Sequence, residues 1–478
     1  MKIVRRLSLL TLALALMFGV TPNLAGSVAQ AETVPSVIDE QLRAVLTNAT
    51  APLQVVVTFK GDSAPTTAQI DLLRQLGISQ GITFRSLPIA GVLATAAQVN
   101  ALANHPEIRS LDLNYALSYD NYDATALTGV DRVRTDANML RLNGGLPVTG
   151  NGVTVLVNDS GIDATHRDLQ FGSHVVQNVE AALNLNALEP TLLPVTYVEN
   201  VPNTDATGGH GTHVAGIVGG TGAMSNGKYE GVAPGADLIG YGSGAALLLL
   251  DTLGGFDYAL THQTQYGIRV VTNSWGNTGD VGTAFDPNDP INIATKRLYD
   301  RGIVVVFSAG NSGPDASTIT GNFKKAPWVV TVAAGDKERQ LADFSSRGTA
   351  GVGGSFTLDG QAWTWADRPT ITAPGVNIIS TRAASPIGAI GTPDDINLIE
   401  PAFLPFYTTL SGTSMAAPHV AGIVALMLDA NPNLSPTQVK QILQETATPM
   451  SGYTTWEVGN GYVNAYTSVD RAFKTRTR

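Results

Sequence analysis

The chain has 478 residues, of which 44% are hydrophobic and only 14% charged, so it is long enough for two or more domains with large cores. Its formal net charge is −10 and no Lys/Arg cluster offsets it, which argues against nucleic acid as a partner. The absence of cysteine excludes disulfides, thiolate chemistry and cysteine-ligated zinc.

The N-terminus has the pattern of a targeting segment. A basic start is followed by an apolar run over 7–20, and 29–31 (AQA) supplies the small residues that a signal peptidase accepts. The apolar run is too short to span a membrane comfortably, with an uncleaved anchor as the alternative. We expect a signal peptide over residues 1–31 and a secreted protein that has no membrane attachment after cleavage. The lack of cysteine favours a bacterial export route.

Residues 32–119 have the rhythm of a small separate domain. Strand-like and helical runs alternate in the order βαββαβ, which is the plan of a ferredoxin-like α+β domain. That plan hosts many functions and does not indicate one by itself. The strand-like runs are 53–60, 82–85, 90–94 and 108–113, and the helical runs are 68–76, which ends at Gly77, and 98–103.

Residues 120–478 form the second expected domain. Its first part, 120–152, is polar and glycine-spotted, and the domain boundary is expected near the start of that part. Continuous Val/Ile runs then indicate an α/β fold with a mostly parallel central sheet and helices on both faces. In such folds function lies at the carboxyl ends of the strands. The runs are VTVLV (153–157), VVTNS (270–274), IVVVFSA (303–309) and WVVTVAA (328–334).

Two polar residues in the first half of this domain could each have either a chemical role or an ordinary structural role. Asp159 lies just after the first Val-rich run, where a carboxylate at the C-terminal edge of a buried strand is held rigidly and partly desolvated. The alternative is that this aspartate only makes a turn, which is the more common case. His210 opens the string HGTHVAG and is either a general base at a helix N-terminus or, with His213, a metal-binding pair. No acidic residue that could be a third metal ligand lies nearby in the sequence, so the role of His210 as a general base is favoured.

Two further polar residues lie in the second half. Asn311 follows the third Val-rich run, where its amide either caps a turn or donates a hydrogen bond to an oxyanion. Ser414 lies in GTSMAAPHVAG at the first turn of an apolar helix, where a serine is commonly an N-cap. The small residues around it let another chain approach, and a helix N-terminus favours developing negative charge.

Together, in the chain order Asp, His, Asn and Ser, these four residues indicate a function far more specifically than any one of them alone. The strings VNDSGID, HGTHVAG, SAGNSGP and GTSMAAPHVAG resemble those of the subtilisin-like serine proteases, the subtilases, over about residues 125–470. The order Asp, His, Ser is that of subtilisin and not that of chymotrypsin or the α/β-hydrolases. The domain at 32–119 likewise looks like a subtilase propeptide.

The resemblance implies a catalytic role for each of the four residues. Ser414 would attack the scissile carbonyl, and His210 would take its proton and later deliver it to the leaving amine. Asp159 would hold the imidazole tautomer and stabilise the imidazolium. The Asn311 side chain and the Ser414 backbone N–H would form the oxyanion hole.

The resemblance also implies where a peptide substrate lies. Ser274-Trp275-Gly276 and Ser308-Ala309-Gly310 match the segments that line the pocket for the residue preceding the scissile bond. Gly240-Tyr241-Gly242 resembles the edge strand that pairs with an extended substrate, which makes Gly242 an expected substrate contact.

A subtilase propeptide implies synthesis as a zymogen. Residues 32–119 would assist folding and inhibit the catalytic domain, and the tail 114–119 would thread the cleft as the first substrate. The expected autocleavage follows Tyr119. The mature protein is expected to be a monomer whose partners are protein or peptide substrates and its own propeptide.

The chain departs from a minimal subtilase in its loops. Three inserts, Leu183 to Val201, Gly351 to Trp365 and Ser385 to Pro405, leave the catalytic residues in place but can reshape the rim of the cleft. No cofactor is expected for the chemistry. Structural calcium is possible at Asp286 to Asp289 or at Asp394-Asp395, although such clusters are more often solvated turns, so no metal ligand is assigned.

Two other functions compete with the protease. Gly412 to Ala416 imitates the nucleophile elbow of an esterase, but an esterase of that fold places its histidine last in the chain. A non-catalytic binding protein on a subtilase scaffold would usually lack a triad residue, whereas all three are present here.

The hexapeptide HVAGIV occurs twice, at 213–218 and 419–424, in unrelated surroundings. Each copy is predicted to begin a helix just after a catalytic residue. The Ala-Gly pair in each copy would let the two helices pack closely, with His213 and His419 as packed neighbours rather than catalytic groups.

Overall fold

The computed structural model describes residues 37–61, 63–84, 88–113, 122–181, 195–243, 248–277, 279–384 and 392–476. The chain divides into two compact units, residues 1–116 and 117–478. The predicted signal peptide and the predicted cleavage segment 114–119 lie outside the described residues, as do parts of two predicted inserts.

After a helix that was not predicted, α1, the first unit has the predicted βαββαβ order around a four-stranded antiparallel sheet, with strand order β2-β3-β1-β4. Both core helices begin with a capping box, in which a threonine and a glutamine three residues later satisfy each other's backbone N–H. Its elements are α1 (Glu40–Leu46), β1 (Leu53–Phe59), α2 (Thr67–Gln75), β2 (Gly81–Thr83), β3 (Ile89–Ala94), α3 (Ala96–Ala103) and β4 (Ile108–Leu113).

A seven-stranded parallel sheet forms the centre of the second unit, in the order β13-β10-β9-β8-β5-β7-β6. The four predicted Val-rich runs are β5, β8, β9 and β10, so the α/β prediction is confirmed. Later strands are added on both sides of β5, which makes β5 the switch point of the sheet. The strands are β5 (Thr154–Asp159), β6 (Val175–Glu180), β7 (Asp237–Gly242), β8 (Ile268–Asn273), β9 (Val304–Ser308), β10 (Val330–Gly335) and β13 (Ile371–Pro374).

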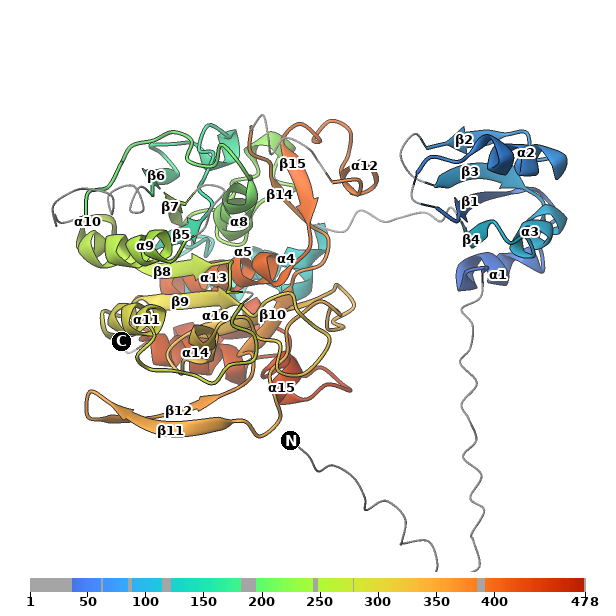
Figure 1. Cartoon of the computed structure of the whole chain (residues 1–478). Coiled ribbons are helices and arrows are strands. Elements are labelled where there is room, and N and C mark those ends of the chain that lie inside the picture. Colours follow the sequence, from blue (N-terminus) through green and yellow to red (C-terminus); the bar gives the residue numbers. More distant parts are fainter. Residues whose placement is uncertain are drawn as a thin grey trace, which may run out of the picture. The chain divides into compact units, whose positions relative to one another are not determined.

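Helices cover both faces of this sheet (Figure 1). Because side chains alternate along a strand, Val155 and Val157 enter one core cluster while Leu156 enters the other. The first cluster includes α8 (His210–Gly219), α13 (Thr413–Ala430) and α16 (Ala465–Lys474), and the second includes α9 (Leu249–Thr261) and α11 (Pro290–Asp300). The remaining elements are α4 (Tyr122–Thr128), α5 (Val130–Thr135), α6 (Ala137–Leu142), η1 (Arg167–Leu169), η2 (Ala223–Ser225), α10 (Gln263–Tyr266), η3 (Asn322–Lys325), β11 (Gly353–Leu358), β12 (Gln361–Ala366), β14 (Ile378–Thr381), α12 (Asp395–Leu398), β15 (Tyr407–Leu410), α14 (Pro436–Glu445) and α15 (Thr455–Val458).

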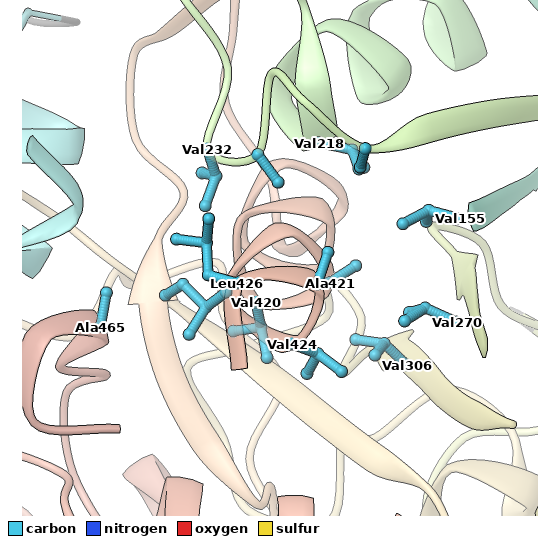
Figure 2. Close-up of a cluster of buried hydrophobic side chains, with 14 of the residues drawn as sticks. Val155, Val218, Val232, Val270, Val306, Val420, Ala421, Val424, Leu426 and Ala465 are labelled. Atoms are coloured by element: carbon cyan, nitrogen blue, oxygen red, sulfur yellow. The ribbon is translucent and has the colours of Figure 1, made fainter. Parts of the chain in front are cut away.

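Helix α13 is the central helix of the second unit. Figure 2 shows its Val420 and Val424 among strand residues that include Val270 and Val306. Within the described part of the chain, α13 is the one helix long and apolar enough to cross a membrane, but 89% of its window is buried in the protein. It is therefore accounted for as a core helix.

The segment 120–152 was interpreted as a polar, glycine-spotted stretch, but in the structure it contains three short helices, α4, α5 and α6. Val130, Val133 and Met139 are fully buried, and the Asp136 carboxylate caps α6 by accepting from two backbone N–H groups. Each helix has seven residues or fewer, too short to show a clear apolar period in the sequence.

The predicted insert at 351–365 forms a β-hairpin of β11 and β12. Trp363 of the hairpin packs edge-on against Trp328 and against Tyr299 of α11. The hairpin therefore extends the α11 side of the sheet.

Candidate active site

Asp159 and His210 meet at the carboxyl end of the central sheet. Asp159 is the last residue of β5 and His210 the first residue of α8, and His210 Nδ1 lies 2.6 Å from Asp159 Oδ1. The carboxylate also accepts the Ser160 N–H at 2.8 Å, which orients it. Because a carboxylate only accepts, Nδ1 carries the proton and Nε2 is left as a basic nitrogen.

His210 contacts a buried carboxylate on one side and is partly exposed to solvent on the other. Its side chain is 37% exposed while that of Asp159 is 4% exposed, and Nε2 has no hydrogen-bond partner among the described residues. Burial by itself lowers the pKa of His210, but the Asp159 charge and hydrogen bond, with a smaller effect of Asp205, raise it above its ordinary value. The imidazolium is thus stabilised while Nε2 stays reachable.

Two glycines allow α8 to begin directly beside β5. A Cβ atom on Gly211 would lie 2.2 Å from the Gly161 carbonyl oxygen, so no other residue fits there without a shift of the backbone. Gly161 itself has a φ of +129°, a conformation that side chains disfavour. The close approach of these two segments places His210 over the Asp159 carboxylate.

Asp205 is a site residue that the sequence interpretation missed. It is fully buried, and its Oδ1 accepts from Ser160 Oγ and the Gly209 N–H, each at 2.9 Å. Its Oδ2 accepts from the Thr212 N–H at 3.0 Å and from Thr212 Oγ1 at 2.6 Å. Burial raises the pKa of Asp205 above its ordinary value, although the hydrogen bonds that its carboxylate accepts lower the pKa in part. The carboxylate thus caps the N-terminus of α8 and positions His210.

Ser414 is the second residue of α13, in the helix turn beside the same end of the sheet. Its hydroxyl donates to the Ser274 carbonyl oxygen at 3.0 Å, and Ser274 Oγ donates back to the Ser414 carbonyl at 2.8 Å. No hydrogen bond joins Ser414 and His210 among the described residues. Unliganded sites often lack this contact, which forms when a substrate is bound.

The Asn311 side chain is oriented by α13. Its Oδ1 accepts from both the N–H and the hydroxyl of Thr413, each at 2.9 Å. These two donors identify which end of the amide is oxygen, and Nδ2 then remains as a donor without a partner in the described structure. A Cβ atom on Gly412 would lie 3.3 Å from Nδ2, so the amide nitrogen lies close to the residue two positions before Ser414.

The two segments predicted to line the substrate pocket are neighbours. Ser274-Trp275-Gly276 directly follows β8, Ser308 ends β9, and these strands are paired. Ser308 Oγ also donates to the Trp275 carbonyl at 3.5 Å. The segments therefore run side by side at the carboxyl edge of the sheet.

The edge-strand interpretation of Gly240-Tyr241-Gly242 is wrong. These residues end β7, which is paired with β5 on one side and with β6 on the other up to Gly242. The Gly242 carbonyl also accepts the Ala181 N–H at 2.7 Å. With both sides used within the sheet, Gly242 has no free edge for a substrate strand.

The histidines of the two HVAGIV copies are buried and have hydrogen-bond partners other than Asp159, His210 and Ser414. His213 Nε2 contacts the Ile378 and Thr408 carbonyl oxygens at 2.9 and 3.0 Å, and His419 Nε2 contacts Thr128 Oγ1 at 2.9 Å. Burial lowers the pKa of each to about 3, with a further lowering of that of His213 by His210. Both are neutral at physiological pH.

The Ala-Gly pair of each copy was predicted to let α8 and α13 pack closely, and this holds for one copy of the two. A Cβ atom on Gly422 of α13 would lie 2.9 Å from the Val218 carbonyl oxygen of α8, so here the two helices do approach closely. Gly216 of α8 instead faces β14, where a Cβ atom would lie 2.2 Å from Thr381 Oγ1. Only one of the two glycines therefore serves the contact between the helices.

The acidic clusters considered for calcium have local partners. The Asp289 carboxylate caps α11 through the Ile291 N–H at 2.7 Å, and Asp395 forms an ion pair with Arg382 at 2.5 Å. Within the described ranges there is no group of three or more acidic or histidine side chains arranged for a metal ion.

Known proteins resemble this chain over the stretch that holds the site. The model of the Subtilase family matches residues 150–466. Serine protease AprX of Bacillus subtilis (strain 168) is 33% identical over 395 residues, which cover 78% of each chain. Subtilisin Savinase of Lederbergia lenta is 31% identical over 344 residues, covering 70% of this chain and 96% of the relative. The solved structure of Sphericase has a TM-score of 0.51 at 28% identity and covers 70% of this chain and 97% of its own.

Proposed function

The chain belongs to the subtilase family of serine proteases, and from that premise we propose that it is a secreted endopeptidase with Ser414, His210 and Asp159 as its catalytic triad. The observation that carries the assignment is the 2.6 Å contact between His210 Nδ1 and Asp159 Oδ1 at the carboxyl end of β5. This contact leaves Nε2 basic and accessible on the side from which a substrate must come. Peptide hydrolysis in this family needs no cofactor.

In the proposed acylation step, the Ser414 hydroxyl turns from the Ser274 carbonyl toward His210 as the substrate binds. Ser414 Oγ forms a bond to the scissile carbonyl carbon while its proton moves to His210 Nε2. The tetrahedral intermediate then collapses, the C–N bond breaks, and the imidazolium gives its proton to the leaving amine. In deacylation, water repeats these steps and returns Ser414 to its free form.

The oxyanion is proposed to be held by Asn311 Nδ2 and the Ser414 backbone N–H. The support is that Asn311 Oδ1 accepts from the N–H and the hydroxyl of Thr413, so the amide is held in one orientation with Nδ2 near Gly412 and ready to donate. Such preorganised donors favour the transition state because they need no rearrangement as the charge develops. Asp205 is proposed as a positioning residue that holds the start of α8.

A serine-reactive fluorophosphonate tests the proposed nucleophile directly. We expect stoichiometric labelling of the mature protein at one serine, which peptide mass spectrometry identifies as Ser414, together with hydrolysis of casein. The labelling should be lost when the protein is heat-denatured, because only the folded site activates the hydroxyl. Labelling elsewhere, or hydrolysis of short esters without casein, would contradict the proposal.

Synthesis as a secreted zymogen is also part of the proposal. Residues 32–119 would act as inhibitor and folding assistant, and cleavage after Tyr119 would release a catalytic domain of 120–478. The compact first unit with its own buried core supports a separable domain. The intact mass of the mature protein should place its N-terminus at Asp120, and a start far from there would rule out this cleavage position.

A further inference from the structure

A buried lysine lies beside Gly276, in one of the two segments assigned to the pocket for the residue preceding the scissile bond. Lys324, in η3, is only 2% exposed. A Cβ atom on Gly276 would lie 2.5 Å from its Nζ and 2.4 Å from Thr320 Oγ1. A Cβ atom on Gly310 would lie 2.5 Å from the same Thr320 Oγ1. Thr320 thus packs between the two glycine segments, and the Lys324 ammonium lies beside it.

The Lys324 ammonium is poorly satisfied where it lies. Nζ donates one hydrogen bond, to Thr320 Oγ1 at 2.9 Å, and neither its second nor its third N–H has an acceptor in the described structure. Burial lowers the pKa of Lys324 to about 7, and no charged neighbour contributes to the shift. A buried ammonium without a carboxylate is costly, so such groups are normally paired.

Two other lysines in the same region, the buried Lys325 and the half-buried Lys440, show what a structural lysine looks like. Lys325 forms an ion pair with Asp367 at 3.0 Å, in which both side chains are 1% exposed. Lys440 Nζ donates to the Pro327 and Val329 carbonyl oxygens at 2.9 and 2.7 Å. Lys324 has neither a carboxylate nor a pair of carbonyls, so its partner is missing from the protein itself.

The geometry points to a substrate carboxylate as that partner: we propose that Lys324 gives this enzyme a preference for glutamate or aspartate immediately before the scissile bond. The inference rests on the proposed protease function and on the assignment of the two glycine segments to the pocket. A substrate carboxylate that passes Gly276 and reaches Nζ accepts the unused N–H donors in a charge-assisted hydrogen bond. A lysine or arginine there meets a like charge, and a large apolar side chain leaves the ammonium desolvated and unpaired.

Four tetrapeptide p-nitroanilides that differ only in their last residue, Glu, Gln, Phe or Lys, test this preference. We expect kcat/KM for the Glu substrate to exceed that for the Gln substrate by about tenfold or more, because the two differ in charge and hardly in shape. In Lys324→Met the Glu/Gln ratio should fall to about one, since methionine fills the space without charge. Lys324→Gln should do the same.

The matched control is Lys440→Met, the same change at a half-buried lysine whose Nζ donates to backbone carbonyls instead of to Thr320. Its Glu/Gln ratio should equal that of the native enzyme. All rates are divided by the fraction of enzyme labelled by the fluorophosphonate, so a partly unfolded variant does not distort them. Lys324→Met should fold, because replacing an unpaired buried charge by an apolar side chain of similar length is often neutral or stabilising.

A native Glu/Gln ratio of one or less, or a ratio that Lys324→Met leaves unchanged, would overturn the inference. These outcomes differ from a failure of the proposed function. If Ser414 does not react with the fluorophosphonate and no substrate is cleaved, the protease assignment fails. If Ser414 reacts and the Phe substrate is preferred, only the role of Lys324 fails.

Discussion

Ser414→Ala is expected to lower kcat by about 10⁶-fold, the size of the loss when the triad serine of subtilisin is removed. The variant keeps the helix start, the Asn311 amide and the Asp159–His210 pair, but it has no hydroxyl to form the acyl-enzyme. A small rate above that in water should remain, because binding and oxyanion stabilisation persist. The measurement is kcat on a peptide p-nitroanilide, with intact mass to detect unprocessed precursor.

Ser411→Ala is the matched control for this variant. Ser411 lies three residues before Ser414, and its hydroxyl contacts the half-buried Asn377 rather than any proposed catalytic group. It should mature and cleave substrate at nearly the native rate. A Ser414→Ala protein that matures normally and retains full activity would contradict the protease mechanism as a whole.

Asp159→Asn is expected to lower kcat by about 10⁴-fold while leaving the fold intact. An asparagine amide can present its N–H₂ group to His210 Nδ1, which favours the tautomer with the proton on Nε2 and so removes the base. The negative charge that stabilises the imidazolium is lost as well. The loss should be smaller than for Ser414→Ala, since the nucleophile is still present.

The same variant should shift the pH profile in a defined direction. His210 acts as a base only when it is neutral, so kcat/KM rises as the pH increases through the His210 pKa. Asp159 raises that pKa in the native enzyme, and its neutralisation therefore moves the acidic limb of the profile to lower pH. Activity measured on one p-nitroanilide across the pH range gives both the loss and the shift.

Asp359→Asn makes the same chemical change at a distant position. Asp359 lies in the turn between β11 and β12 with its side chain 70% exposed, and its φ of +52° suits asparagine. Neither kcat nor the acidic limb should change. A profile of Asp159→Asn that overlays the native one would show that this carboxylate does not control the titrating base.

Local patterns in the sequence were sufficient to predict the architecture. Unbroken Val/Ile runs require strands covered on both faces, and the structure places them in one parallel sheet between two helical layers. The positions of Asp159 and Asn311 just after such runs placed both residues near the carboxyl ends of strands, where function is expected in such folds. These inferences succeed because periodicity and strand ends are properties of short stretches of chain.

Other features depend on which segments become neighbours in space. The sequence does not show that β7 is enclosed by β5 and β6, so Gly242 was wrongly expected at an edge. Asp205 carries no motif of its own, and only the folded loop brings its carboxylate to the N–H groups at the start of α8.

Lys324 and Lys325 show most clearly the difference between what the sequence predicts and what the tertiary structure decides. They are the same residue type at adjacent positions, and nothing in the sequence distinguishes them. Because successive side chains diverge from the backbone, Lys325 reaches Asp367 while Lys324 turns toward Thr320 and Gly276. The sequence by itself determined the sheet, the order of the proposed catalytic residues and the family. The tertiary structure alone decided which of two identical buried charges is paired, because pairing depends on distant segments that meet only in the fold.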